Sequence, residues 1–392
     1  MHSAQTASPT ATAGDPDADV LVVGAGPTGL TLAAALASKG LRALVVDGQA
    51  AGDNTSRAAV VHAHTLEALQ ALDVSPRLVR IGLPVGRFTV RDCDRILMPI
   101  TFDHLPTAYP YALMVSQAVT ERILRARLAE LGGQVRRPCR LTGLAQDDGG
   151  VNARLDDGSS LRARFLVGAD GMHSTVREQT GIGFSGGRYE ESFVLADVQL
   201  SAGVPADEVI LYLSPAGMVV TAPLPGGLHR VVATVEQAPQ QPELADIQAL
   251  LDERGPQRHR PRVQALDWSS RFRIHHRVAD TYRAGRVLLA GDAAHVHSPA
   301  GGQGMNTGML DAMRLAEALT EALNGDLHAL DRYEAERRPV AQQVVRLADR
   351  LTRLATVPSA LRPVRNLAVA AAAQIPAVRR QLAWRLSGLI HR

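Results

Sequence analysis

The pattern of apolar positions begins with an uninterrupted strand, Val20–Val23, followed by an Ala- and Leu-rich segment of helical composition. A second apolar run, Leu41–Val46, ends at Asp47. A third run follows Arg286 and leads into a glycine-rich loop, after which we expect a helix that starts near Met309. Apolar runs without polar alternation indicate strands that are buried on both faces. These segments predict a Rossmann-like α/β layer assembled from distant parts of the chain.

The middle of the chain shows a different pattern, in which apolar and polar residues alternate over short segments divided by turns such as Pro225–Gly227. Alternation with a period of two is typical of strands that have one buried face. The predicted strands are Arg87–Arg91, Glu191–Leu200, Glu208–Leu213, Gly217–Pro223 and His229–Val235. We therefore expect a second, α+β layer built on a mostly antiparallel sheet.

A glycine motif, Gly24–Gly29, joins the first strand to the following helix. In this βαβ context Gly24 allows a tight turn, Gly26 lets the backbone approach a pyrophosphate, and Gly29 permits close packing of the helix on the strand. Asp47 follows Gly29 by 18 residues, a spacing at which its carboxylate can accept hydrogen bonds from ribose hydroxyls. Because an acid there disfavours a 2′-phosphate, the motif predicts FAD or NAD rather than NADP.

Residues 286–308 form a second ligand-binding signature. The apolar strand ends before Gly291 and Asp292, and the loop beyond it contains the closely spaced Gly301, Gly302 and Gly304. Glycines at the mouth of a helix leave bare backbone N–H groups, which suit a flat electron-rich or anionic ligand edge. Together with the first signature, about 260 residues earlier, this loop predicts a flavin.

Three further features fit the same ligand. Asp170 lies in a turn between a strand and a helix, within Leu166–Arg177. Arg57 places a cation beyond the ribose acid, and Gln117 opens the predicted helix Gln117–Gly132, where its amide suits a sugar or phosphate. Arg57 and Gln117 are equally compatible with ordinary solvated surface positions, so that alternative stays open.

Three motifs occur in the order GxGxxG, GADGxxSxVR and GDAAHxxxPxxGxGxN, at residues 24–29, 168–177 and 291–306. In this order they resemble the single-component FAD-dependent aromatic hydroxylases of the para-hydroxybenzoate hydroxylase type, and most of all the bacterial polyketide and phenol hydroxylases. The resemblance covers about residues 18–350. The cofactor-binding positions that it implies are Gly24, Gly26, Pro27, Thr28, Gly29, Asp47, Gly48, Arg57, Gln117, Asp170, Gly291, Asp292, Pro299, Gly302, Gly304, Met305 and Asn306.

The resemblance also implies a role for each group of these positions. The Gly24–Gly29 motif would hold the FAD pyrophosphate, and Asp292 the ribityl and phosphate portion. Pro299 would line the substrate side of the flavin, and backbone N–H groups of Gly304–Asn306 would face its pyrimidine edge. His295 belongs to the motif in a structural role.

The chain departs from the family pattern in three places. Many relatives have Glu-Arg where this chain has Asp47-Gly48, and Arg where it has His64. Arginines near His64 have been linked to nicotinamide use in the family, so the choice between NADPH and NADH stays open. Several polyketide hydroxylases also have a third, thioredoxin-like domain, which we do not expect here because the sequence stops at Arg392.

The expected segments are a disordered leader at 1–18, an FAD-binding domain formed by 19–85, 117–189 and 278–349, a substrate-binding sheet formed by 86–116 and 190–277, and basic C-terminal helices at 350–392. A second GxGxxG is absent from the sequence, so we expect NAD(P)H to visit transiently rather than to occupy a domain of its own.

The function implied by the resemblance is hydroxylation of an aromatic or polyketide-like molecule, as in antibiotic biosynthesis, with NAD(P)H, O₂ and a flavin C4a-hydroperoxide. A phenolate activates itself, so we assign no catalytic acid or base. Strand alternation suggests Tyr212, Met218, Val220, Ala222 and Pro299 as pocket residues, although Tyr212 is also typical of a sheet core.

Three other functions are alternatives to aromatic hydroxylation. A Baeyer–Villiger or epoxidising monooxygenase would use the same motifs. A slow-turnover protein that binds FAD and a metabolite also stays open. A flavin-dependent halogenase is disfavoured, because its Trp-x-Trp-x-Ile-Pro segment is missing from a chain whose two tryptophans are Trp268 and Trp384.

Composition narrows the setting. The sequence is 46% hydrophobic, enough for one large core or two coupled ones. Cys93 and Cys139 lie far apart, and the pairs His275-His276 and His295/His297 have no matching carboxylates nearby in the sequence, so we expect no disulfide framework and no metal site. With no signal peptide and no apolar run of membrane length, we expect a cytoplasmic monomer or homodimer that binds a small aromatic substrate and no nucleic acid.

Charge is unevenly placed. Residues 350–392 contain eight arginines and no acid, so the rest of this chain of net charge +3 carries −5. An apolar stripe at Leu382, Trp384, Leu386, Leu389 and Ile390 lies opposite Arg379, Arg380 and Arg385. This pattern predicts a pair of helices packed on the FAD-binding domain, or alternatively a basic amphipathic segment that contacts an anionic membrane or an acidic partner.

Overall fold

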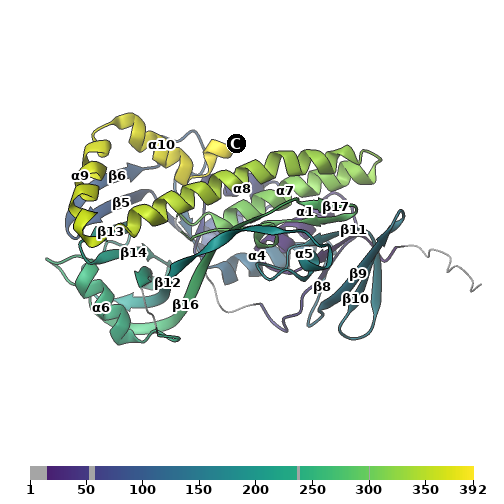
Figure 1. Ribbon diagram of the computed structural model, residues 1–392, viewed down its shortest axis with the longest axis horizontal. Helices are drawn as coiled ribbons and strands as arrows, with labels where there is room; N and C mark the ends of the chain where they lie inside the picture. The colour runs from purple at the N-terminus through teal and green to yellow at the C-terminus, as the bar shows by residue number, and fades with distance from the viewer. Residues whose placement is uncertain (1–15, 53–57, 236–238, 300) are drawn as a thin grey trace, which may run out of the picture.

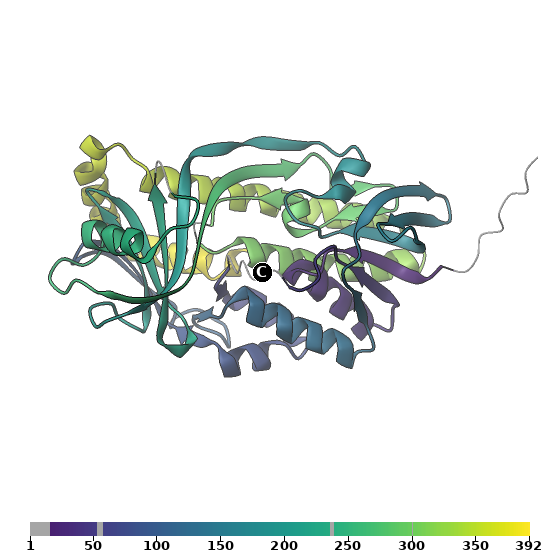
Figure 2. The same ribbon diagram turned by 90° about the horizontal axis from the view of Figure 1, so that it is seen from below.

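The computed structural model describes residues 16–52, 58–235, 239–299 and 301–392. Two large sheets lie at opposite ends of an elongated molecule, and the long helix α8 (His328–Ala355) runs along it (Figure 1). The long antiparallel strands β12 (Phe184–Leu200) and β16 (Val263–Ala279) also connect the two ends (Figure 2). The chain therefore weaves between two layers.

The first sheet is built around five parallel strands. Its order is β17 (Arg283–Ala284), β18 (Val287–Leu289), β11 (Ser160–Gly168), β1 (Ala18–Val23), β2 (Ala43–Val46) and β8 (Gln134–Arg136), and β10 (Gly150–Leu155) and β9 (Leu141–Asp147) extend it from β11. The pairs from β18 to β8 are parallel, as in doubly wound folds. The carboxyl ends of these strands therefore share one edge, where such folds bind ligands.

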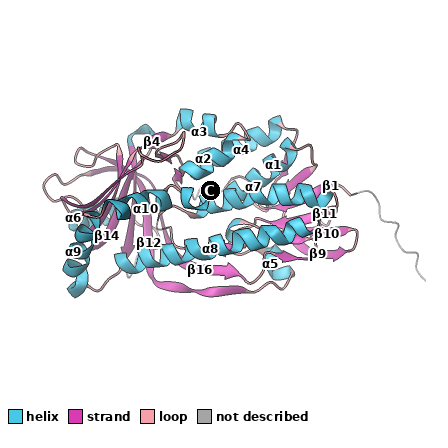
Figure 3. Ribbon diagram, turned by 90° about the horizontal axis from the view of Figure 1, so that it is seen from above, coloured by secondary structure: helices cyan, strands magenta, loops and turns pink. Residues whose placement is uncertain are grey.

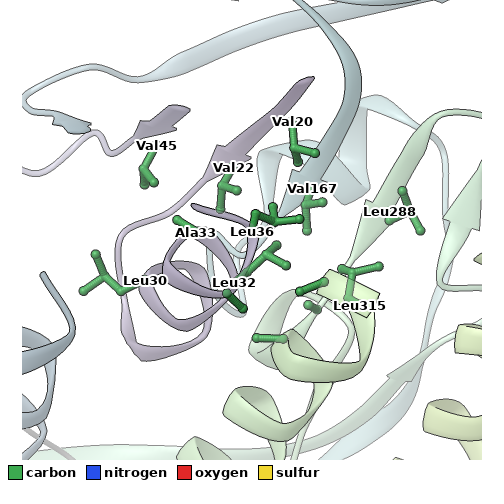
Figure 4. Packing of buried hydrophobic residues seen from close by; sticks show 14 of the residues in the cluster. Val20, Val22, Leu30, Leu32, Ala33, Leu36, Val45, Val167, Leu288 and Leu315 are labelled. Carbon is green, nitrogen blue, oxygen red and sulfur yellow. The ribbon is translucent and has the colours of Figure 1, made fainter. Parts of the chain in front are cut away.

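Helices cover this sheet and close its core. They are α1 (Pro27–Ser38), α4 (Gln117–Glu130), α5 (Thr175–Gln179) and α7 (Gly304–Leu323). Figure 4 shows Leu32 and Leu36 of α1 packed with Val22, Val167 and Leu315, all of them buried. Helices α7 and α8 lie side by side (Figure 3).

Two glycines set how closely α1 packs. A Cβ at Gly29 would lie 1.9 Å from the Gly24 carbonyl oxygen, and one at Gly308 of α7 would lie 2.3 Å from Thr28 Oγ1. Both positions therefore require glycine for close approach.

The second sheet is mostly antiparallel. Its order is β19 (His295–Val296), β16, β12, β15 (Leu228–Val235), β14 (Gly217–Pro223), β13 (Glu208–Ser214), β5 (Arg87–Asp92) and β6 (Arg95–Thr101), with β13 and β5 parallel. Helix α6 (Leu244–Arg254) covers one face. The other face meets α9 (Arg362–Ala373) and α10 (Pro376–Leu386).

A small sheet and several short helices complete the fold. The small sheet has the order β3 (Val60–Val61), β7 (Ala112–Met114) and β4 (Leu83–Val85). The remaining helices are α2 (Ala63–Gln70), α3 (Ser75–Ile81), η1 (Pro225–Gly227), η2 (Gly291–Ala293), η3 (Ser359–Leu361) and η4 (Leu389–His391). In the described part of the chain, no helix is long and apolar enough to cross a membrane.

The α/β class and the mostly antiparallel second sheet agree with the sequence prediction, and the predicted strand Gly217–Pro223 coincides with β14. The prediction that a helix starts near Met309 is wrong, since α7 begins at Gly304. The Asn306 amide donates to the carbonyls of Val60 and Gly302 and so holds this first turn in place. Gly308 lies inside α7, where the absence of a side chain allows close approach to Thr28.

The C-terminal helices also differ from expectation. Helices α9 and α10 pack chiefly on β6 of the second sheet rather than on the FAD-binding layer. The segment from Arg385 onward also reaches that layer, where the Ser387 carbonyl accepts from the His64 backbone N–H and Arg392 pairs with Glu67. Of the predicted stripe, Leu386 and Leu389 are buried in the apolar cluster, Leu382 and Trp384 are partly buried against it, and Ile390 is exposed.

Candidate functional site

A cavity of about 320 Å³ opens at the carboxyl edge of the parallel strands. Six of the predicted cofactor positions line it: Gly24, Gly26, Asp47, Gly48, Gln117 and Asp170. These residues come from four separate stretches of sequence and meet because the carboxyl ends of β1, β2 and β11 share one edge.

The N-terminus of α1 faces this cavity with bare backbone. Gly24 has φ of +106°, and a Cβ there would lie 2.2 Å from the Ala169 carbonyl oxygen, so the turn demands glycine. A Cβ at Gly26 would meet no described atom within 4 Å. The space above Gly26 is therefore open, and the first N–H groups of α1 suit an anion there.

The Asp47 carboxylate is held by three donors. Oδ2 accepts from the Ala25 backbone N–H at 2.8 Å and from Arg137 Nη2 at 3.0 Å, and Oδ1 accepts from the Gln49 N–H at 2.8 Å. A carboxylate offers about four acceptor directions. Oδ1 therefore keeps capacity for one more donor, such as a ribose hydroxyl.

Two arginines at this end were missed by the sequence prediction. Arg137 also donates to the Ala25 carbonyl at 3.0 Å, which ties it to the glycine turn. Arg140 lines the cavity, and its Nε would lie 3.1 Å from a Cβ at Gly48. Arg140 thus fills space next to the position where many relatives have arginine. Both residues follow β8, and the pairing of β8 with β2 brings them to this edge of the sheet.

Asp170 and Gln117 support the cavity wall through bonds of their own. The Asp170 carboxylate accepts from Ser174 Oγ at 2.5 Å and from the Val176 N–H at 3.1 Å. Burial raises the pKa of this carboxyl above its ordinary value, although these hydrogen bonds act in the opposite direction. The Gln117 amide donates to Glu121 at 2.9 Å. Both side chains fix backbone next to the cavity.

The predicted flavin loop adjoins the same helix terminus. A Cβ at Gly291 or Gly308 would lie within 2.5 Å of Thr28 Oγ1, so the loop after β18 and the start of α7 both touch α1. Asn306 Oδ1 accepts from the His62 backbone N–H at 2.8 Å. Gly302 has φ of +63°, and a Cβ there would lie 2.4 Å from Val60 Cγ1. Gly304 and Met305 open α7, with Pro299 just before them and Asp292 in η2.

A buried charged cluster braces this loop from behind. Asp311 accepts from His295 Nε2 at 2.6 Å and from Arg337 Nε at 2.7 Å, and all three residues are at most 5% exposed. Burial alone would raise the pKa of Asp311, but Arg337 and His295 outweigh it and lower the pKa. These bonds tie α7, α8 and β19 together, which supports a structural role for His295.

The proposed pocket residues fall on two faces of the second sheet. Met218, Val220 and Ala222 alternate along β14 and point to the face that meets the small sheet and the C-terminal helices. Tyr212 pairs with Val219 and is fully buried under α6 on the other face. Burial raises the pKa of Tyr212 to about 12. The strand register therefore places Tyr212 on the opposite face of the sheet from Met218, Val220 and Ala222.

Other expectations can be located only in part. Arg57 lies outside the described residues. Within the described ranges, no group of three or more His, Cys, Asp or Glu side chains is arranged to hold a metal ion. Cys139 is buried and Cys93 is partly exposed, and both are free thiols.

Comparisons with known proteins point to the same cofactor. A family model described as FAD binding domain matches residues 17–348. The 6-methylpretetramide 4-monooxygenase of Streptomyces rimosus is 40% identical over 361 residues, which are 89% of this chain and 65% of that protein. This chain thus spans just under two thirds of the length of that relative.

Two solved structures extend the likeness. Anhydrotetracycline hydroxylase from Streptomyces rimosus is 34% identical with a TM-score of 0.79, covering 95% of this chain and 76% of that one. The p-nitrophenol 4-monooxygenase from Pseudomonas putida DLL-E4 is 27% identical with a TM-score of 0.84, covering 94% of this chain and 97% of that one. The match over residues 17–348 and the glycine-lined cavity at the edge of the parallel strands place this chain in the FAD binding domain family.

Proposed function

We propose that this protein is an FAD-dependent monooxygenase that uses NAD(P)H and O₂ to hydroxylate an aromatic or polyketide-like small molecule. The observation that carries the proposal is that Val60 touches both sides of the site. Its side chain lies against Gly302 of the flavin loop, and it packs with the apolar clusters that contain Val220 and Ala222 of β14. An apolar substrate wall and a flavin-binding loop therefore adjoin one another.

The residues of this chain would bind and orient FAD along one path. Asp47, held by Arg137, would accept the adenosine ribose, and the bare N–H groups near Gly26 would bind the pyrophosphate. The first turn of α7, from Gly304, would present N–H groups to the flavin ring. FAD, when bound, supplies the redox chemistry, since it accepts a hydride from NAD(P)H and reacts with O₂ to deliver one oxygen atom.

The substrate side is proposed to be the face of β14 that carries Met218, Val220 and Ala222, with Pro299 of the flavin loop as a further lining residue. These side chains and their neighbours are mainly aliphatic, so they would exclude water and leave a phenol to be activated by its own ionisation. On this basis we propose that 19–85, 117–189 and 278–349 bind FAD and that 86–116 and 190–277 form most of the substrate wall. The contacts of β7 (Ala112–Met114) with β3 and β4 assign this strand to the junction.

The test is anaerobic stopped-flow reduction of the bound flavin by NADPH and by NADH, with and without fused-ring phenols. Bleaching of flavin absorbance that one phenol accelerates, followed by a hydroxylated product when O₂ is admitted, is the expected result. Val220→Phe should weaken binding of that phenol, whereas the matched variant Tyr212→Phe, on the other face of the sheet, should not. A flavin that neither nucleotide reduces would contradict the proposal and favour a protein that binds FAD and a metabolite.

A further inference from the structure

Helix α9 packs Val369, Ala372 and Ala373 inward, yet it also buries polar side chains and exposes large apolar ones. Arg365 and Asn366 are buried, at 5% and 6% exposure, whereas Val364 and Leu367 are 64% and 68% exposed. The exposed positions Val364, Leu367, Ala368 and Ala371 follow helical spacing on α9, and Ile375 is exposed just beyond its end; we call these five residues the α9 stripe. A surface helix normally buries its large apolar side chains and exposes its polar ones. An exposed apolar stripe therefore indicates a surface that binds a partner.

This orientation of α9 is fixed by hydrogen bonds on the inner side. Arg365 Nη2 and Asn366 Nδ2 both donate to the Leu213 carbonyl, at 2.9 and 3.0 Å, and Arg365 Nε donates to Asn366 Oδ1 at 3.0 Å. These bonds anchor α9 to the end of β13. The helix cannot roll its apolar side inward without breaking them, because both polar side chains would then lose their partners.

The stripe belongs to a larger exposed apolar area at this end of the molecule. Six of the ten large hydrophobic side chains exposed among the described residues lie between Leu354 and Ile390. Trp384 and Ile390 line a shallow hollow with Arg380 on α10. Helices α9 and α10 are adjacent at one end of the molecule (Figure 1), so these features share a neighbourhood.

The arginines near the α9 stripe indicate which kind of partner covers it. Arg353 lies exposed before it but pairs with Asp349, and Arg379 and Arg380 follow Ile375 in the first turns of α10. Residues 350–392 contain eight arginines and no acid. A second copy of the chain docked through this face would bring two such clusters together, which like-charge repulsion opposes. An apolar stripe flanked by arginines matches the acyl chains and phosphate headgroups of an anionic lipid surface.

We propose that α9 and the start of α10 dock this protein on anionic membrane surfaces, with the α9 stripe among the acyl chains and Arg379 and Arg380 at the lipid phosphates. The inference is independent of the proposed function. It concerns a reversible surface contact, since no described helix is long and apolar enough to cross a membrane.

The test is co-sedimentation of the FAD-loaded full chain with phosphatidylcholine vesicles that contain or lack phosphatidylglycerol. We expect binding only to the anionic vesicles, weakened by salt. Val364→Ser with Leu367→Ser should weaken it at least about tenfold. Arg379→Gln with Arg380→Gln should weaken it about fivefold per arginine. The matched controls Leu327→Ser, at the far end of α8, and Arg125→Gln, on α4, should bind as the parent does.

Thermal melting and FAD content would show that each variant remains folded. Lack of binding by the parent, equal binding to vesicles without anionic lipid, or unchanged binding by the stripe variant would each overturn the proposal. A homodimer seen by light scattering and separated by the stripe variant would overturn it as well, because a second copy would then cover α9.

Discussion

Gly26→Ala should impair FAD binding while leaving the fold of the apoprotein unchanged. Gly26 has φ of −77° and ψ of −176°, an extended conformation that alanine adopts without strain. A Cβ there would meet no described atom within 4 Å. The free energy of unfolding of the apoprotein should therefore change by less than about 0.5 kcal/mol.

The substitution Gly26→Ala should lower the affinity for FAD, because the proposed pyrophosphate must approach this position closely. A methyl group above Gly26 would displace it from the N–H groups of the first turn of α1, with the loss of about one hydrogen bond to a charged group. Such a bond contributes roughly 1.5–3 kcal/mol, so the dissociation constant for FAD should rise about 10- to 100-fold.

Gly29→Ala is the matched comparison, because the same substitution three residues later meets protein instead of open space. Its Cβ would lie 1.9 Å from the Gly24 carbonyl oxygen and 3.3 Å from Val22 Cγ1, so backbone must move. We expect this variant to lose about 1–3 kcal/mol of unfolding free energy as well as FAD affinity.

The assay is urea unfolding of each apoprotein, paired with FAD titration followed by quenching of flavin fluorescence. A Gly26→Ala protein that binds FAD within about twofold of the parent would refute the assignment of this turn to the pyrophosphate. If Gly26→Ala and Gly29→Ala lost the same unfolding free energy, the conclusion that a Cβ at Gly26 meets no protein atom would be wrong.

Three further predictions concern ionisable side chains that are buried or partly buried. Arg137→Gln should weaken FAD binding about tenfold in the same titration, since Asp47 loses its cationic partner, and unchanged affinity would contradict this. Asp311→Asn should cost about 3–5 kcal/mol in urea unfolding by leaving a buried guanidinium unpaired, and a loss below about 1 kcal/mol would count against it. Burial lowers the pKa of both His62 and His297 to about 4, so the unfolded chain binds more protons between about pH 6.5 and 4. Stability should be full above this window and fall as pH drops through it, by up to about 1.4 kcal/mol per pH unit for each histidine, and His297→Asn should reduce that slope.

The sequence predicts this fold best where the signal is local. Alternation located β14 to the residue, and the glycine spacing of Gly24–Gly29 located the turn after β1, because each depends on a few neighbouring residues. Arg137 and Arg140 escaped prediction, since their place in the cavity depends on which strand lies beside β2. That order is a property of the whole sheet.

The sequence also could not predict which face of a strand lies toward the cofactor. Alternation shows that Tyr212 and Leu213 point in opposite directions, but which of them meets the cofactor side depends on pairing with β14 and on where α6 lies. The C-terminal helices illustrate the same limit. The sequence predicted an apolar stripe around α10, of which the structure buries Leu386 and Leu389 and exposes Ile390. The Ala-rich α9 gave little local sign that Arg365 and Asn366 would lie on its inner side.

Thr28 explains why FAD binding and folding should be coupled in this protein. Its hydroxyl lies against Gly291 and Gly308, which are 263 and 280 residues away in the sequence, so one residue of the pyrophosphate turn contacts both ends of the proposed flavin loop. A ligand that spans this junction binds the assembled layers and not the unfolded chain. It must therefore stabilise the fold by RT ln(1 + [L]/Kd), about 2.7 kcal/mol at a hundredfold excess over Kd. Because the contact at Thr28 joins the segments that we propose bind the two halves of the cofactor, an adenosine fragment alone should stabilise the protein less than FAD does.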